Sequence, residues 1–418
     1  MRKQDDGLFN VRLDRFEGKL AIGLFNGLAA LRMETKGCMT PVFAFKDGSQ
    51  LTNTHWTPAF RLPDAVPRGE GLLGYICGEF PCCPTFGPGC TVRGAAIPTH
   101  GWTSSGEWSL DGFGMSSERG EVCCDLSLES PAPELPLSWR RRIVMLEGQS
   151  AYYSLISVRN RGPEPLRINI GHHNTVGLPF LEAGCRISLS ANRFMVPPEG
   201  SEFDATGRLV PGAEFGSLAE APLRKGGVAD ISQVPGIIGA TDFVTGAIPP
   251  EKSLGWSCVV NPRLGLAYIC FFPGDWALPP GEVALGFNDL WMQYGGRRFK
   301  PWAAKDGAED LTLCLGTENA TGAFANGLEY SLGHPEILGR PTTIEVPARG
   351  ERRLYYGTAI VALEPAMVRE GVRRLIDADD AIIIEGKKAH QRLKLEASFD
   401  RLREFLNWPD ARDANGGI

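Results

Sequence analysis

The chain has 418 residues, of which 43% are hydrophobic and 22% are charged, and its formal net charge is −6. This composition predicts a folded globular protein with a large core and excludes a disordered chain. The sequence has no basic block, so we expect no nucleic-acid partner. It has no apolar stretch of the ~20 residues that cross a bilayer, so we expect no membrane partner. MRKQDDGLFN contains no apolar signal segment, so we expect a cytoplasmic location.

Short strands dominate the predicted elements. The sequence contains 51 glycines and 31 prolines, and long helical patterns are few, so many turns and many short strands are expected. Residues 11–62 predict a string of strands, with a hairpin at Asn26-Gly27. Strands continue through 109–165, whereas 185–250 gives only weak strand signals. After Pro365, apolar residues recur at a spacing of three to four and predict helices over Pro365–Ile376 and His390–Trp408.

The cysteines indicate a reducing compartment. Their number, 11, is odd, and two pairs are adjacent in the chain, which is unfavourable for disulfides. Four of them cluster, at Cys77, Cys82, Cys83 and Cys90, and a metal site there is one interpretation. No C-x-x-C spacing occurs and no histidine is interleaved, so small buried thiols and no metal are predicted.

Alternating apolar residues lead into two adjacent histidines in LRINIGHHNTVGLPF, Leu166–Phe180. Successive side chains of a strand point to opposite faces, so one face is predicted to be buried and the other polar and open. The buried face contains Leu166, Ile168, Ile170 and His172. The polar face contains Asn169, Gly171 and His173, so we expect His173 to face a cleft near the end of this strand.

The same alternation recurs in LTLCLGTENATG, residues 311–322. Leu311, Leu313 and Leu315 are predicted to form the buried face. Glu318 then ends the strand on the other face, two residues after Gly316, as His173 follows Gly171. In both strands the small residue is expected to leave room for a ligand over the strand end.

A loop rich in glycine, proline and aromatic residues carries a resemblance to a known family. In GLLGYICGEFPCCPTFGPG and IPTHGWTSSGEW (71–89 and 97–108), the motif residues are Gly78, Pro81, Pro84, Phe86, Gly87, Pro88, His100, Gly101, Trp102 and Trp108. Together with Asn160, Arg161, Gly162 and Pro165 before the histidine strand, these residues resemble the aldose 1-epimerase (galactose mutarotase-like) superfamily, nearest to its hexose-phosphate epimerase branch. Ile76-Cys77 stand where that branch has a phosphate-binding arginine, which argues against a phosphorylated sugar.

The resemblance implies a fold and a set of roles. The implied fold is all-β, one large antiparallel β-sandwich, which we expect to span 1–365. From the apolar spacing after Pro365 we expect a helical extension over 366–410 packed on it, and we expect a monomer or homodimer. The catalytic residues are His173 as general acid, Glu318 as base and His100 as a hydrogen-bonding group. Candidate contacts to a small-molecule sugar are Arg93, Trp102, His172, Asp242 and Trp291.

Anomer interconversion needs one acid and one base, and no cofactor or metal is expected. Trp276, Trp291, Tyr294 and Trp302 form either a stacking surface for a sugar ring or an aromatic core. Two alternatives stay open at this stage: a non-catalytic carbohydrate-binding protein or accessory domain of the same fold, and a metal enzyme that uses the histidines. Absent motifs argue against nucleotide hydrolysis, zinc proteolysis and serine hydrolysis.

Overall fold

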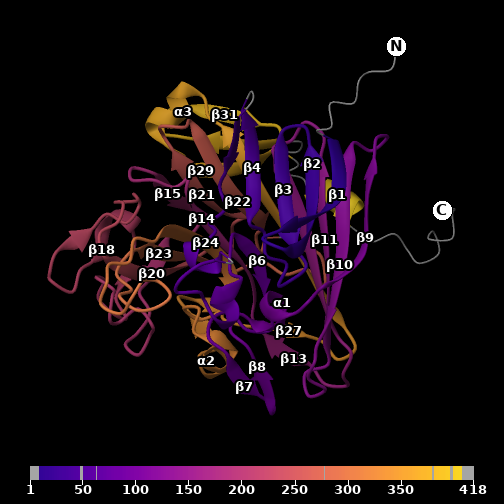
Figure 1. Ribbon diagram of the computed structural model, residues 1–418, viewed down its shortest axis with the longest axis horizontal. Helices are drawn as coiled ribbons and strands as arrows, with labels where there is room; N and C mark the ends of the chain where they lie inside the picture. Colours follow the sequence, from indigo (N-terminus) through magenta and orange to yellow (C-terminus); the bar gives the residue numbers. More distant parts are fainter. Residues whose placement is uncertain are drawn as a thin grey trace.

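The computed structural model describes residues 9–47, 50–62, 64–276, 278–378, 381–395 and 399–406. Their strands form antiparallel sheets that stack in layers, with few and short helices (Figure 1). This architecture confirms the predicted all-β class and the large antiparallel β-sandwich.

The larger layer is an eight-stranded sheet in the order β15-β21-β22-β28-β12-β11-β10-β9. Its strands are Ser109–Ser116 (β9), Glu121–Glu129 (β10), Leu137–Leu146 (β11), Ala151–Asn160 (β12), Arg186–Leu189 (β15), Leu254–Asn261 (β21), Leu266–Pro273 (β22) and Glu351–Ala362 (β28). Most of its central strands are apolar on both faces, which indicates that the sheet is covered from both sides.

A seven-stranded sheet faces it, in the order β17-β16-β20-β23-β24-β14-β6. Its strands are Glu79–Cys82 (β6), Ile170–Gly177 (β14), Arg193–Met195 (β16), Glu214–Phe215 (β17), Ala240–Ala247 (β20), Phe287–Tyr294 (β23) and Leu313–Thr321 (β24). The two strands with predicted catalytic residues, β14 and β24, are neighbours in this sheet, although the chain between them is long.

The N-terminal strands form a five-stranded meander beside the seven-stranded sheet. They are Phe9–Phe16 (β1), Lys19–Asn26 (β2), Ala29–Glu34 (β3), Val42–Asp47 (β4) and Gln50–Asn53 (β5). The predicted hairpin at Asn26-Gly27 is confirmed, because β2 and β3 pair around it and Gly27 has φ 91°. Single bridges, Thr40 to Glu79 and His55 to Val176, join this meander to β6 and β14.

Shorter elements connect the sheets. They are η1 Ala59–Arg61, η2 Gly71–Gly74, β7 Cys90–Val92, β8 Ala95–Ile97, α1 Gly101–Ser105, β13 Leu166–Ile168, η3 Leu218–Glu220, β18 Ala221–Pro222, β19 Val228–Ala229, α2 Gly327–Gly333, β25 Glu336–Ile337, β26 Arg340–Pro341 and β27 Ile344–Val346. Four strands of the middle section, β15, β16, β17 and β20, belong to the two large sheets, although residues 185–250 show only weak strand signals in the sequence.

An ion-paired cluster lies in the core between the two large sheets. Glu79 on β6 accepts hydrogen bonds from Arg141 and His172, each at 2.6 Å, and all three side chains are fully buried. Burial raises the pKa of Glu79, but Arg141 and His172 outweigh that effect and hold it at about 2. Glu79 therefore compensates a buried cation, and removal of one partner leaves an uncompensated charge.

The C-terminal section differs from the prediction. The helix expected over Pro365–Ile376 ends early, as α3 (Pro365–Glu370), and the helix expected over His390–Trp408 is described only as α4 (Phe399–Leu406). Between them lies a three-stranded sheet, β29 Arg374–Ala378, β30 Ala381–Glu385 and β31 His390–Leu393. Gly371, with φ 74°, ends α3, and Arg374–Ala378 then pairs as a strand with β30, whose residues Ile382–Ile384 are β-branched and favour a strand.

This small sheet and α4 cover the outer face of the eight-stranded sheet. Ile382, Ile384, Phe399 and Leu402 are buried in one cluster with Phe271 of β22 and other residues of the large sheet. Residues 407–410 of the predicted extension lie outside the described residues. The division of the chain at residue 365 stays a prediction. None of the helices in the described part of the chain is long and apolar enough to cross a membrane.

Candidate active site

A cavity of about 460 Å³ lies on the face of the seven-stranded sheet that is turned away from the eight-stranded sheet. His172 and Asn174 on β14 contact Tyr356 of β28, in the eight-stranded sheet, so His173 between them points to the opposite face. His100, His173 and Glu318 all line this cavity. The three residues predicted to be catalytic are therefore brought together.

His173 lies in the middle of β14, and not at a strand end as predicted. Its ring stacks on Phe80 of β6 at 4.5 Å between centroids, and its Nδ1 lies 3.0 Å from the Thr175 hydroxyl. The predicted open face is in fact covered, because His173 is only 4% exposed. Burial lowers the pKa of His173 well below its ordinary value, and neighbouring His100 lowers it further.

Glu318 on β24 lies directly beside His173. Its Oε1 is 3.3 Å from Nε2 of His173, and β24 continues three residues beyond it to Thr321. Burial raises the pKa of Glu318 well above its ordinary value, and the Asp289 carboxyl raises it further. The histidine and the glutamate are thus both driven toward their uncharged forms.

Gly171 and Gly316 were predicted to leave room for a ligand, and this prediction is wrong. A Cβ at Gly316 would lie 2.5 Å from Oε1 of Glu318. A Cβ at Gly171 would lie 2.6 Å from Cβ of Ala320 on the adjacent strand. Gly316 therefore makes space for the carboxyl group itself, and Gly171 for the neighbouring strand.

His100 enters the cavity from the loop before α1. The Gly87 N–H donates to its Nδ1 at 3.2 Å, and burial lowers the pKa of His100 to about 4. The neutral ring therefore carries its proton on Nε2, which is free to donate. Its ring centroid lies 5.0 Å from that of His173. Gly101 has φ 83°, and a Cβ there would lie 2.1 Å from the Cys83 carbonyl oxygen, so the turn after His100 requires glycine.

Two polar residues near the pair were not predicted. Thr175, whose hydroxyl lies against His173, and Asp289 on β23, the cross-strand neighbour of Glu318, are both buried. Neither carboxyl oxygen of Asp289 has a hydrogen-bond partner among the described residues, and burial raises its pKa to about 7. The cross-strand register that brings Asp289 to Glu318 could not be derived from one strand alone.

Aromatic and cationic side chains form the rest of the wall. Trp291 and Trp302 line the cavity with their ring centroids 6.0 Å apart, and Trp291 lies 5.7 Å from the His173 ring. The Trp291 indole N–H is buried and has no hydrogen-bond partner among the described residues. The Arg297 guanidinium lies over the Trp302 ring at 4.7 Å. Of the other predicted stacking residues, Tyr294 is buried and Trp276 is an exposed side chain away from the cavity.

Of the five predicted sugar contacts, Trp291 is the one that lines this cavity. Arg93 lies at an exposed hairpin turn and pairs with Glu164 at 3.2 Å. Trp102 is buried in the core, with its ring 6.3 Å from that of Trp139.

His172 and Asp242 were also predicted to contact sugar, and both lie outside this cavity. His172 points into the core because side chains alternate along β14. Asp242 accepts hydrogen bonds from Arg208 at 2.6 and 2.7 Å. Its neighbour Phe243 reaches the cavity in its place.

The cysteine cluster has the character of buried thiols. Cys77, Cys82 and Cys83 are buried and Cys90 is half-buried. Burial raises the pKa of the Cys83 thiol to about 12. Within the described residues, no group of three or more histidine, cysteine, aspartate or glutamate side chains is arranged to hold a metal ion.

Comparison with known proteins shows which solved structures have a similar fold. The chain matches no protein-family model and no curated protein sequence. Among solved structures, it is similar to a candidate aldose 1-epimerase from Klebsiella pneumoniae (12% identity, TM-score 0.59, 84% of this chain and 82% of the other covered). A galactose mutarotase-like protein from Clostridium acetobutylicum (11%, 0.58, 86% and 100%) and a galactose mutarotase related enzyme from Lactobacillus acidophilus (11%, 0.52, 82% and 98%) are also similar. The chain thus has the fold of the aldose 1-epimerase, or galactose mutarotase-like, superfamily.

Proposed function

We propose that the chain is an aldose 1-epimerase-like isomerase that interconverts the α and β anomers of a hexose or a related aldose. The observation that carries this proposal is the contact of His173 Nε2 with Glu318 Oε1, at 3.3 Å, in a cavity that also contains His100. An acid and a base within reach of one small ligand are what the reaction requires.

The reaction moves two protons and needs no oxidant or leaving group. Glu318 removes the proton from the C1 hydroxyl while His173 donates one to the ring oxygen, so that the C1–O5 bond breaks and C1 becomes a carbonyl. Rotation about C1–C2 exposes the other face of the carbonyl. Ring closure returns both protons to their original groups, with the C1 configuration inverted in half of the turnovers.

The environment of the pair supports a single shared proton. Burial favours the uncharged pair, in which Glu318 holds the proton and the imidazole of His173 is neutral. That form is also the state of the pair while the sugar ring is open. Transfer along the 3.3 Å contact gives the imidazolium and carboxylate that start ring opening. Because the mobile proton moves on Nε2, Nδ1 of His173 carries a proton in both forms, and the Thr175 hydroxyl can accept a hydrogen bond from it in each.

Two further groups can orient the sugar. His100 carries its proton on Nε2 and can donate to a sugar oxygen, and the Trp291 ring lines the cavity. Flat aromatic walls suit the apolar face of a pyranose. Neither group needs to change its protonation state during the reaction.

Saturation-transfer NMR on freshly dissolved glucose and galactose tests this function directly. We expect anomer exchange above the buffer rate with the wild-type protein, and exchange reduced to the buffer rate by His173→Ala or Glu318→Gln. If a sugar binds in calorimetry but its anomer exchange is no faster than in buffer, the protein is a non-catalytic carbohydrate-binding protein and not an isomerase. Activity retained by both variants would refute the assigned roles.

A further inference from the structure

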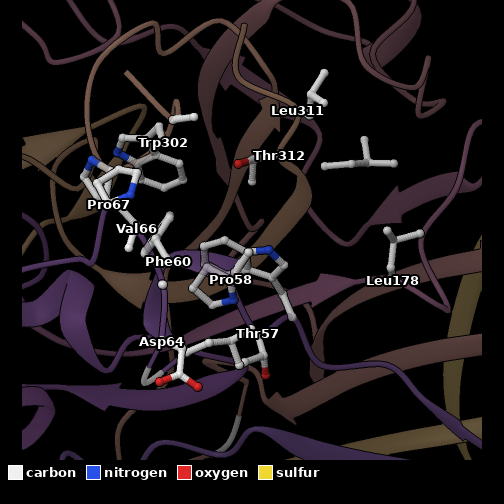
Figure 2. A pocket seen from close by; sticks show the side chains of 17 residues that line it. Thr57, Pro58, Phe60, Asp64, Val66, Pro67, Leu178, Trp302, Leu311 and Thr312 are labelled. Atoms are coloured by element: carbon white, nitrogen blue, oxygen red, sulfur yellow. The ribbon is translucent and has the colours of Figure 1, made fainter. Parts of the chain in front are cut away.

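A second, larger cavity adjoins the candidate active site. This groove has a volume of about 800 Å³ and lies beside the first cavity, with Trp302 lining both (Figure 2). In Figure 2, Trp302 and Val66 lie at the left of the groove and Leu178 at the right. Its volume is in the range of sites that bind small molecules.

The strands that hold the catalytic pair also lead to this groove. Leu178 directly follows β14, five residues beyond His173, and Leu313 begins β24, five residues before Glu318. At about 3.3 Å per residue, the groove therefore extends to roughly 17 Å from the pair along both strands. A ligand whose reacting end lies at His173 can reach the groove past Trp302.

The lining of the groove is apolar, and much of it is exposed. Leu178, Leu311, Val66 and Leu62 are 66%, 68%, 92% and 45% exposed, although large aliphatic side chains normally avoid water. Among the described residues that line the groove, Asp64 is the one charged side chain. The groove therefore suits an apolar group and disfavours an anionic one.

We propose that the groove binds a hydrophobic substituent of the sugar, so that the substrate is a reducing sugar with an alkyl, acyl or aryl group on a carbon other than C1. This inference rests on the proposed function, because epimerisation requires a free C1 hydroxyl. The sugar ring lies at His173 and Glu318, and the substituent passes Trp302 to contact Leu178 and Leu311.

Octyl ethers of glucose and galactose at O3, O4 and O6 are suitable probes, with the unsubstituted sugars as references. Calorimetry measures binding and saturation-transfer NMR measures anomer exchange. The test variant is Leu178→Ser with Leu311→Ser, two exposed side chains outside the catalytic pair. The matched control is Leu13→Ser with Leu51→Ser, which are 51% and 56% exposed and do not line the groove.

We expect at least one octyl ether to bind about tenfold more tightly than its parent sugar, because burial of two methylene groups gives about that factor. The gain should disappear in the Leu178/Leu311 variant, persist in the control, and leave exchange of unsubstituted sugar unchanged. If no octyl ether binds more tightly than its parent sugar, or if the gain persists in the test variant, the proposal is wrong.

Sedimentation of the same proteins tests whether a second copy of the chain occupies the groove instead. If the wild type is a dimer that the Leu178/Leu311 substitutions dissociate, the groove is an interface between copies and the proposal is overturned. If leucine-dependent octyl binding occurs without anomer exchange of any sugar, the proposed function fails and the groove stands as a binding site. If exchange occurs without an octyl effect, the groove proposal alone fails.

Discussion

Substitution of Asp289 by asparagine should change how stability depends on pH. The Asp289 side chain is fully buried, and neither oxygen has a hydrogen-bond partner among the described residues. Its pKa rises from 3.8 to about 7 because burial penalises the charged form. Asparagine has the same shape and does not titrate, so the variant removes the ionisation and keeps the packing.

The magnitude and sign follow from linkage. The unfolded carboxyl loses its proton near pH 3.8, whereas the folded one keeps it until about pH 7. Between these values the unfolded state binds fewer protons, so stability decreases as pH rises. A pKa of about 7 against 3.8 corresponds to a loss of about 4 kcal/mol of the free energy of unfolding between pH 4 and pH 8.

Urea unfolding from pH 4 to pH 8 measures this difference. The free energy of unfolding of Asp289→Asn, relative to wild type, should rise by up to about 4 kcal/mol across that range, whatever constant cost the buried amide adds. Glu118→Gln, at an exposed turn position, is the matched control and should show no such trend. A difference between Asp289→Asn and wild type that does not change with pH would refute the reasoning.

The same substitution should be visible in anomer exchange. The negative charge of Asp289 raises the pKa of Glu318, which keeps the last proton on the His173–Glu318 pair to higher pH. Without that charge, the alkaline decline of the exchange rate should move to lower pH. An unchanged alkaline limb would mean that Asp289 does not act on Glu318.

Three further outcomes follow from contacts in the structure. In NMR exchange assays, His173→Ala and Glu318→Gln should each lower the rate by about 10²–10⁴-fold, and near wild-type rates in either would contradict the acid–base pair. Thr175→Val should lower the exchange rate about tenfold while Thr175→Ser retains it, since only the hydroxyl supports both forms of the imidazole. Arg141→Met should lower the free energy of unfolding in urea by about 3–5 kcal/mol, because Glu79 loses its buried counter-ion. Adding Glu79→Gln should recover part of that loss. If the effects of the two substitutions are additive, the pair is not coupled.

Side-chain alternation was sufficient to separate the two adjacent histidines. The period of two along Leu166–Phe180 is a local property, and it assigned His173 to the cavity face and His172 to the core face. The same argument placed Glu318 on the cavity face of its own strand. Both assignments depend only on the residues of one strand, so they needed no knowledge of the sheet.

Features that depend on pairing between strands could not be predicted in this way. Asp289 is an ordinary strand residue in the sequence, and its relation to Glu318 comes from the pairing of β23 with β24 in one sheet. Thr175 is different, because it lies two residues after His173 on β14, and alternation alone places it on the same face. The helix expected over His390–Trp408 failed for a related reason. Apolar residues spaced at three to four residues also occur where strand and helix follow each other, as β31 and α4 do.

Burial of His173 and Glu318 changes their chemistry most, and it could not be predicted from the sequence. Alternation predicted an open polar face, but His173 and Glu318 are 4% and 2% exposed. An open pair would be held as imidazolium and carboxylate by water. In the covered site both charges are disfavoured, and Nε2 of His173 lies 3.3 Å from Oε1 of Glu318. Under the proposed function, the pair would pass a proton across this contact without exchange with solvent. A reaction that runs reversibly through ring opening and closure is served by that arrangement.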